Sequence, residues 1–105
     1  MIRGNYIGLN ASGSSALPNA GDGVYGAFTH GIEVGGTNAA ARNVISGNRR
    51  GVFVQNGHNW LIANNYVGVD SASVVARSNR AEGIYFSTSC FSNLVENNLV
   101  SGNNG

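Results

Sequence analysis

An internal repeat restricts this chain to architectures that stack similar units. Residues 6–24, YIGLNASGSSALPNAGDGV, align without a gap with residues 66–84, YVGVDSASVVARSNRAEGI. A shorter unit also recurs, as NVISGNRRG over residues 43–51 and as NLVSGNNG over residues 98–105. Repetition of glycine and asparagine at matched positions is typical of a solenoid.

An asparagine precedes a short apolar segment four times, at Asn5, Asn43, Asn65 and Asn98. The spacing between successive members is uneven, so the unit tolerates insertions while it keeps its short motifs. A solenoid with loops inserted at one corner behaves in this way. Asparagine suits a tight corner because it tolerates left-handed backbone and its amide can bond to an equivalent amide one unit away. These four residues therefore predict a structural asparagine ladder.

Each unit contains three short segments whose apolar residues alternate with period two, the pattern of strands with one buried face. The first segments are residues 23–26, 51–54 and 83–86, the second are residues 31–34, 60–63 and 93–96, and the third follows the anchor asparagine, as in residues 66–68. We predict an all-β solenoid of about three to four short rungs with three strands per rung, each strand paired in parallel with its equivalent about 4.8 Å away. Residues 1–105 are expected to form a single partial domain, a fragment of a longer repeat array.

The motifs N-x-I-x-G-N and G-V-x-V, with the inserted I-G-x-(N/D)-x-S segment, resemble the right-handed parallel β-helix repeats of the pectin-lyase-like superfamily. The resemblance covers the whole chain. The motifs are similar in particular to repeat arrays of large secreted bacterial proteins. It implies a right-handed parallel β-helix and a secreted or cell-surface location. It does not define the function, because that superfamily includes lyases, hydrolases, tailspikes, adhesins and passive stalks.

The charge composition argues against several classes of partner. The formal net charge is +1, charged residues make up 10% of the chain and lysine is absent. A nucleic-acid partner is therefore not expected, since its binding needs a basic surplus that displaces counterions. No apolar run approaches the roughly 18 residues of a membrane span. The single cysteine, Cys90, cannot form an intramolecular disulfide.

Three aromatic residues, Tyr25, Phe53 and Tyr85, hold the same place in the three first strands. The alternation places them on the outer surface, stacked on successive rungs. This stripe has three interpretations: a ladder that stabilises neighbouring rungs, a platform for sugar rings, and an interface with another protein. Trp60 opens a second strand, where it either covers a turn or forms part of a binding surface.

Three charged residues, Asp22, Arg50 and Glu82, each directly precede a strand glycine and predict a structural salt ladder. A catalytic carboxylate pair is not expected, because the two acids are about 10 Å apart with a guanidinium between them. The acidic residues are scattered over different corners, and His30 and His58 lie in turns without paired ligands. We therefore expect no catalytic residue, no metal and no cofactor in this chain.

The function most consistent with these features is a structural scaffold without catalysis. The alternative is a carbohydrate-binding module that uses the aromatic stripe, and the third possibility is a fragment of a polysaccharide lyase or hydrolase. Neither terminus shows an amphipathic segment that could cap the solenoid, and residues 9–18 and 37–41 are the only candidates for covering its ends. We expect the chain to associate with itself through these ends, and a polysaccharide is the other partner considered.

Overall fold

The computed structural model describes residues 1–104 and is all-β apart from one short 3-10 turn, η1 (Ala39–Ala41). Gly105, the last residue of the repeat copy at 98–105, lies outside the described residues. The strands have two to four residues each: β1 (Tyr6–Ile7), β2 (Val24–Ala27), β3 (Glu33–Gly35), β4 (Val44–Ile45), β5 (Val52–Gln55), β6 (Leu61–Ala63), β7 (Tyr66–Val67), β8 (Ile84–Ser87), β9 (Leu94–Glu96) and β10 (Leu99–Val100).

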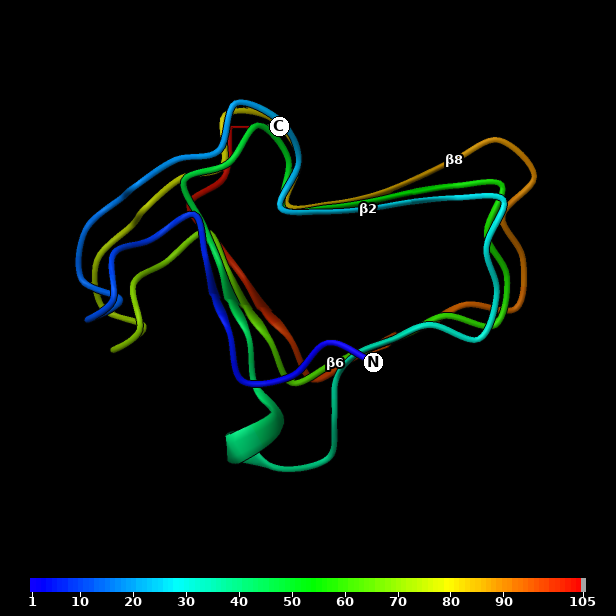
Figure 1. The fold of residues 1–105 in the computed structure, drawn as a ribbon, viewed down its shortest axis with the longest axis horizontal. Coiled ribbons are helices and arrows are strands. Elements are labelled where there is room, and N and C mark those ends of the chain that lie inside the picture. The colour runs from blue at the N-terminus through cyan, green and yellow to red at the C-terminus, as the bar shows by residue number, and fades with distance from the viewer. Residues whose placement is uncertain (105) are drawn as a thin grey trace.

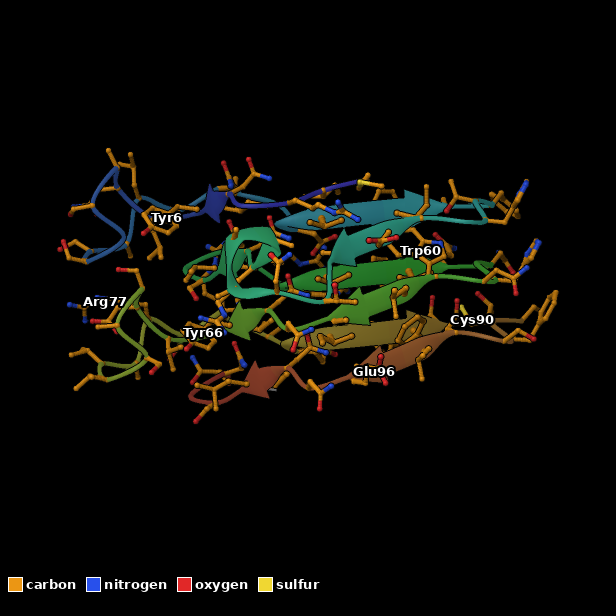
Figure 2. All side chains as sticks on the ribbon, turned by 90° about the horizontal axis from the view of Figure 1, so that it is seen from below. Tyr6, Trp60, Tyr66, Arg77, Cys90 and Glu96 are labelled. Carbon is orange, nitrogen blue, oxygen red and sulfur yellow. The ribbon has the colours of Figure 1, made fainter. Side chains whose placement is uncertain are left out.

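The strands form three parallel sheets, with the orders β1-β4-β7-β10, β2-β5-β8 and β3-β6-β9. The chain visits one sheet after another and then returns to the first, so that three consecutive strands make one rung. Seen along the shortest axis, the rungs lie over one another (Figure 1), and seen from the side they form stacked layers (Figure 2). The prediction of an all-β fold with stacked parallel strands is confirmed.

Alternation within the short strands creates the core. Val52 and Val54 point inward from β5 and are fully buried, while Phe53 between them is only half-buried. Val34, Ile45, Ile62 and Val67 fill the same interior from the other two sheets. Successive side chains of a strand point to opposite faces, so a strand of two to four residues contributes only one or two core side chains.

Trp60 belongs to this core and is only 3% exposed. It therefore does not form part of a binding surface, which was one of the two roles that the sequence left open. Its indole N–H donates to Thr29 Oγ1 at 3.2 Å. The ring lies against Gly26, where an added Cβ would come within 2.4 Å of the Trp60 ring. The absence of a side chain at Gly26 therefore makes room for the indole.

The prediction that insertions occur at one corner is wrong, because the structure places them at two. Residues 8–23 and 68–83 are long connections between the first and second sheets, where the middle rung has only residues 46–51. Residues 36–43, which include η1, enlarge a different corner that other rungs turn with two residues, such as Asn64 and Asn65. The wide spacings in the anchor series, from Asn5 to Asn43 and from Asn65 to Asn98, arise mainly from the long connections.

The two long connections stack on each other although a complete rung separates their strands. The Ser71 N–H donates to the Gly13 carbonyl at 2.9 Å, and Arg77 Nε donates to the Ser14 carbonyl at 2.9 Å. The short corner of the middle rung allows this contact, and there the Gly47 N–H donates to the Arg77 carbonyl at 3.0 Å. The two long connections lie over one another beside the sheet that contains β1 and β7 (Figure 1).

One predicted register is also wrong. The sequence matched residues 31–34 to residues 60–63, which would place Glu33 opposite Ile62, but the structure pairs Glu33 with Leu61 and Val34 with Ile62. The shift of one residue reverses the two faces of a strand. Val34 therefore enters the core, and Glu33 lies outside, where it forms an ion pair with Arg3.

Candidate functional site

The four anchor asparagines form a continuous hydrogen-bonded ladder. The side-chain Nδ2 groups of Asn5, Asn43 and Asn65 each donate to the Oδ1 of the next asparagine, at 3.1, 3.0 and 3.0 Å. That Oδ1 also accepts the backbone N–H of the preceding asparagine, at 3.0, 3.2 and 2.8 Å. Asn43 and Asn65 are fully buried, so the ladder satisfies polar groups that water does not reach.

A second asparagine ladder, which the sequence analysis missed, runs along another corner through Asn19, Asn48, Asn79 and Asn103. Asn19 Nδ2 donates to Asn48 Oδ1 at 2.9 Å, and Asn79 Nδ2 donates to Asn103 Oδ1 at 2.8 Å. The middle step is made by the Asn48 N–H, which donates to Asn79 Oδ1 at 3.0 Å. The signal was present in the match of Asn19 with Asn79 and in the two SGN tripeptides at 46–48 and 101–103.

The aromatic stripe forms a stack of rings on the outer face of the β2-β5-β8 sheet. The ring centroids of Tyr25 and Phe53 are 5.3 Å apart, as are those of Phe53 and Tyr85, with interplanar angles of 27° and 10°. Both faces of the Phe53 ring are therefore covered by neighbouring rings. The two outer rings are more exposed, Tyr25 at 55% and Tyr85 at 37%.

Arg50 lies between the two acidic residues of the predicted salt ladder. Its Nη1 is 3.6 Å from Asp22 Oδ2, and its Nε is 3.5 Å from Glu82 Oε2. The three side chains are 16%, 11% and 39% exposed for Arg50, Asp22 and Glu82, so the pairing is partly buried. The guanidinium carbon also lies 4.3 Å from the ring centroid of Phe53, which joins the charged residues to the aromatic stripe.

His30 and His58 lie in turns, as the sequence indicated, and they also stack on each other. Their ring centroids are 5.1 Å apart, and His58 stacks in turn on Phe91 at 4.8 Å. Within residues 1–104, no group of three or more His, Cys, Asp and Glu side chains is placed to hold a metal ion. These rings thus continue the pattern in which equivalent side chains contact one another from rung to rung.

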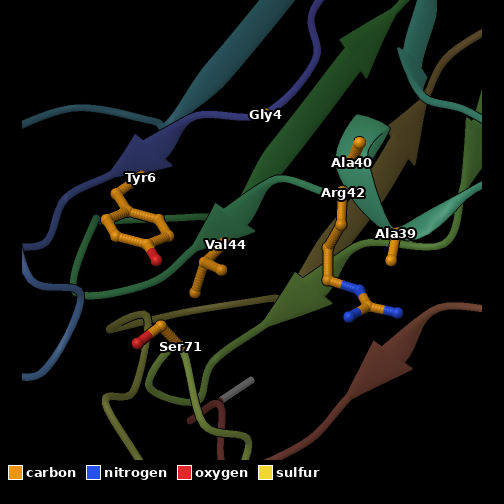
Figure 3. Close-up of a pocket in the computed structure, with 7 residues that line it drawn as sticks. All are labelled: Gly4, Tyr6, Ala39, Ala40, Arg42, Val44 and Ser71. Carbon is orange, nitrogen blue, oxygen red and sulfur yellow. The ribbon is translucent and has the colours of Figure 1, made fainter.

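A pocket of about 280 Å³ lies on the outer face of the β1-β4-β7-β10 sheet (Figure 3). It is open between the η1 insertion and the stacked loops, and no predicted site residue lines it. The lining residues are Gly4, Tyr6, Ala39, Ala40, Arg42, Val44 and Ser71. Sequence reasoning missed this site because its lining comes from the η1 insertion, two strands and a loop, which only the stacking of rungs brings together.

No protein-family model, curated protein or solved structure matches this chain. In residues 1–104, the structure contains no helix with the length and apolar character that a membrane span requires.

Proposed function

We propose that this chain is a non-catalytic structural segment of a secreted or cell-surface protein, folded as a right-handed parallel β-helix, which associates with further copies through its ends. One observation carries the proposal: the polar, charged and aromatic residues that recur from rung to rung contact their own equivalents. The asparagines bond to asparagines, Arg50 pairs with Asp22 and Glu82, and Phe53 stacks on Tyr25 and Tyr85. Groups engaged in this way stabilise a stack and are not free to act on a substrate.

The last rung supports association because it leaves apolar side chains uncovered. Leu94, Val95, Leu99 and Val100 are 52%, 43%, 38% and 46% exposed. Val95 and Val100 continue the rows of the core residues Ile62 and Val67, whose exposure is zero. Another rung would bury them at about 25 cal/mol per Å² of apolar surface, and would pair the open strand edges.

The asparagine ladders give the two ends complementary hydrogen-bonding groups, which favours a second copy in head-to-tail orientation. Every step has the same direction, with N–H groups donating to the Oδ1 of the next asparagine. Among residues 1–104, Asn5 Oδ1 accepts no hydrogen bond, whereas the Asn98 backbone N–H has no acceptor. A copy placed beyond Asn98 would offer its Asn5 Oδ1 to that N–H and would keep the sheets parallel.

Light scattering over a range of concentrations tests the association. We expect the mass to rise above the 10.9 kDa of one chain and to continue beyond a dimer, since a head-to-tail contact does not close on itself. The double substitution Val95→Lys with Val100→Lys should keep the circular dichroism spectrum and reduce the mass to that of one chain. Val74→Lys, on an 80% exposed loop residue, is the matched control and should change nothing.

A chain that keeps the mass of a monomer at high concentration would contradict the association. A species that stops at a dimer would contradict the head-to-tail orientation. The absence of catalysis has its own test: we expect no unsaturated or reducing products from polygalacturonate, alginate or hyaluronan, with or without Ca²⁺. Turnover that disappears when one acidic residue is replaced would refute this part of the proposal.

A further inference from the structure

The η1 insertion differs from the rest of the chain because it has no counterpart in the other rungs. The equivalent corners are made by Asn64-Asn65 and Asn97-Asn98, where Asn64 and Asn97 adopt left-handed backbone with φ of 60° and 56°. At the inserted corner Arg42 takes that place, with a φ of −62°. A stack of rungs does not need this insertion, so its side chains are available for another purpose.

Arg42 is held in position, and within residues 1–104 no carboxylate pairs with it. Its Nε donates to the Asn64 carbonyl at 3.3 Å, and its guanidinium carbon lies 4.2 Å from the centroid of the Tyr66 ring. Among residues 1–104, the ion pairs involve Arg3 and Arg50 but not Arg42. The terminal nitrogens of Arg42 thus carry an unneutralised positive charge at the edge of the pocket (Figure 3).

The remaining walls of the pocket complement this charge. Tyr6, which is 47% exposed, lies on the opposite side beside Ser71, with Val44 between the two sides (Figure 3). Tyr6 and Tyr66 are separated by Val44 in their sheet, so the Tyr6 ring is not stacked on another ring as Phe53 is. In the described part of the chain, no acidic residue lines the pocket. Asp70 precedes Ser71, but its carboxylate is turned into its own loop, where it accepts the N–H groups of Val74 and Val75.

We infer that this pocket binds a small monoanion that joins one flat ring to a carboxylate, with the carboxylate on Arg42 and the ring against Tyr6. An arginine fork matches a planar carboxylate, with which it can form two parallel hydrogen bonds. A single guanidinium neutralises one negative charge, which favours a carboxylate over a phosphate dianion. The volume of about 280 Å³ is just below the usual range for ligand sites and suits a molecule of one ring. The Tyr6 hydroxyl is a further hydrogen-bonding partner, whereas the Ser71 hydroxyl donates to the Ser12 carbonyl at 3.2 Å.

Benzoate is a suitable probe, and benzamide is its neutral counterpart of nearly the same shape. In two-dimensional NMR titrations of the whole chain, we expect benzoate to cause saturable shifts of the Tyr6 and Ser71 amides and of the Arg42 Nε–H. Benzamide should bind at least about tenfold more weakly, since the charge-assisted bond to Arg42 is lost. Acetate, which has the carboxylate without the ring, should also bind more weakly than benzoate.

Arg42→Gln should reduce benzoate affinity at least about tenfold, whereas Arg49→Gln, which removes the same charge from an exposed residue outside the pocket, should leave it unchanged. Tyr6→Leu should weaken benzoate but not acetate. If Arg42→Gln fails to fold, the comparison of benzoate with benzamide on the unaltered chain decides. Equal affinities for benzoate and benzamide, equal losses in the two arginine variants, or no saturable shift at Tyr6 and Ser71 would each overturn the inference.

Discussion

Asn65 bonds to Asn98 twice: its backbone N–H and its side-chain Nδ2 both donate to Asn98 Oδ1, at 2.8 and 3.0 Å. Asn65 is in turn the acceptor of both donors of Asn43, and its own second Nδ2 proton reaches the Val34 carbonyl at 3.0 Å. A single buried amide therefore satisfies groups on three levels of the stack. Among neutral side chains, only asparagine and glutamine combine a carbonyl acceptor with two N–H donors, and the stem of glutamine is longer.

Asn65→Leu should lower the free energy of unfolding by about 1–3 kcal/mol, because the Asn43 donors and the Val34 carbonyl lose a buried partner. Urea denaturation measures the change. Asn5→Leu is the matched control: Asn5 is exposed at the start of the ladder, and its loss should cost under about 1 kcal/mol. Equal effects of the two substitutions would show that the buried hydrogen bonds do not carry the stability.

Asp70 should make stability depend on pH in the acidic range. Asp70 Oδ1 accepts the Val74 N–H at 3.0 Å, and this bond is the largest cause that holds the pKa of Asp70 below its ordinary value of 3.8. The Val75 N–H and the charge of Arg77 also lower this pKa, whereas desolvation raises it. With the pKa lowered in the folded state, the carboxylate contributes its stabilisation fully above the ordinary value. That stabilisation is lost as the pH falls from 3.8 through the folded pKa.

Asp70→Asn should therefore show a smaller decrease in melting temperature than the unaltered chain when the pH is lowered from about 5 to about 2. The first long loop provides the converse test. Asn10 Oδ1 accepts the N–H groups of Ser14 and Ser15 at 3.0 and 3.3 Å, as Asp70 does for its own loop. Asn10→Asp should increase the acid sensitivity. Parallel pH profiles for all three proteins would contradict the assignment.

Gly26→Ala should displace the Trp60 indole and lower the free energy of unfolding by about 1–3 kcal/mol, the usual cost of overpacking a core. Trp60 is the only tryptophan, so its fluorescence emission reports the displacement directly. Gly21→Ala is the control, because an added Cβ there meets no atom within 4 Å. Unchanged emission and stability in Gly26→Ala would mean that the indole does not pack against this glycine.

Arg50→Met should lower the free energy of unfolding by about 1–3 kcal/mol, because Asp22 and Glu82 lose their common partner. This loss lies between those expected for breaking an exposed and a buried ion pair. The thioether side chain retains much of the contact with Phe53. Adding Asp22→Asn to this variant should recover part of the loss, since it removes the more buried of the two uncompensated carboxylates. A double variant with the simple sum of the two single losses would exclude coupling between Arg50 and Asp22.

Some of these features could be predicted from the sequence and others could not. Alternation identified the strand around Phe53, because two buried valines flank an outward residue. The register of Glu33 was missed because the sequence match offset the two second segments by 29 residues, whereas the structure keeps the offset of 28 that pairs Val24 with Val52 and Glu33 with Leu61. The pocket beside Arg42 was beyond prediction, because Tyr6 and Ser71 line its opposite side only through the stacking of segments from different rungs.

The direction of the hydrogen bonds between strands also determines how the molecule responds to force. The bonds of each sheet run along the stacking axis, as in the pairs Tyr6–Val44, Val44–Tyr66 and Tyr66–Leu99. A tensile load applied between Tyr6 and Leu99 acts in line with these bonds, so it opens them a few at a time and does not shear a whole sheet at once. Under such a load the rungs should separate one by one at low force, and side-by-side bundling, not rung number, would be needed to make a strong fibre.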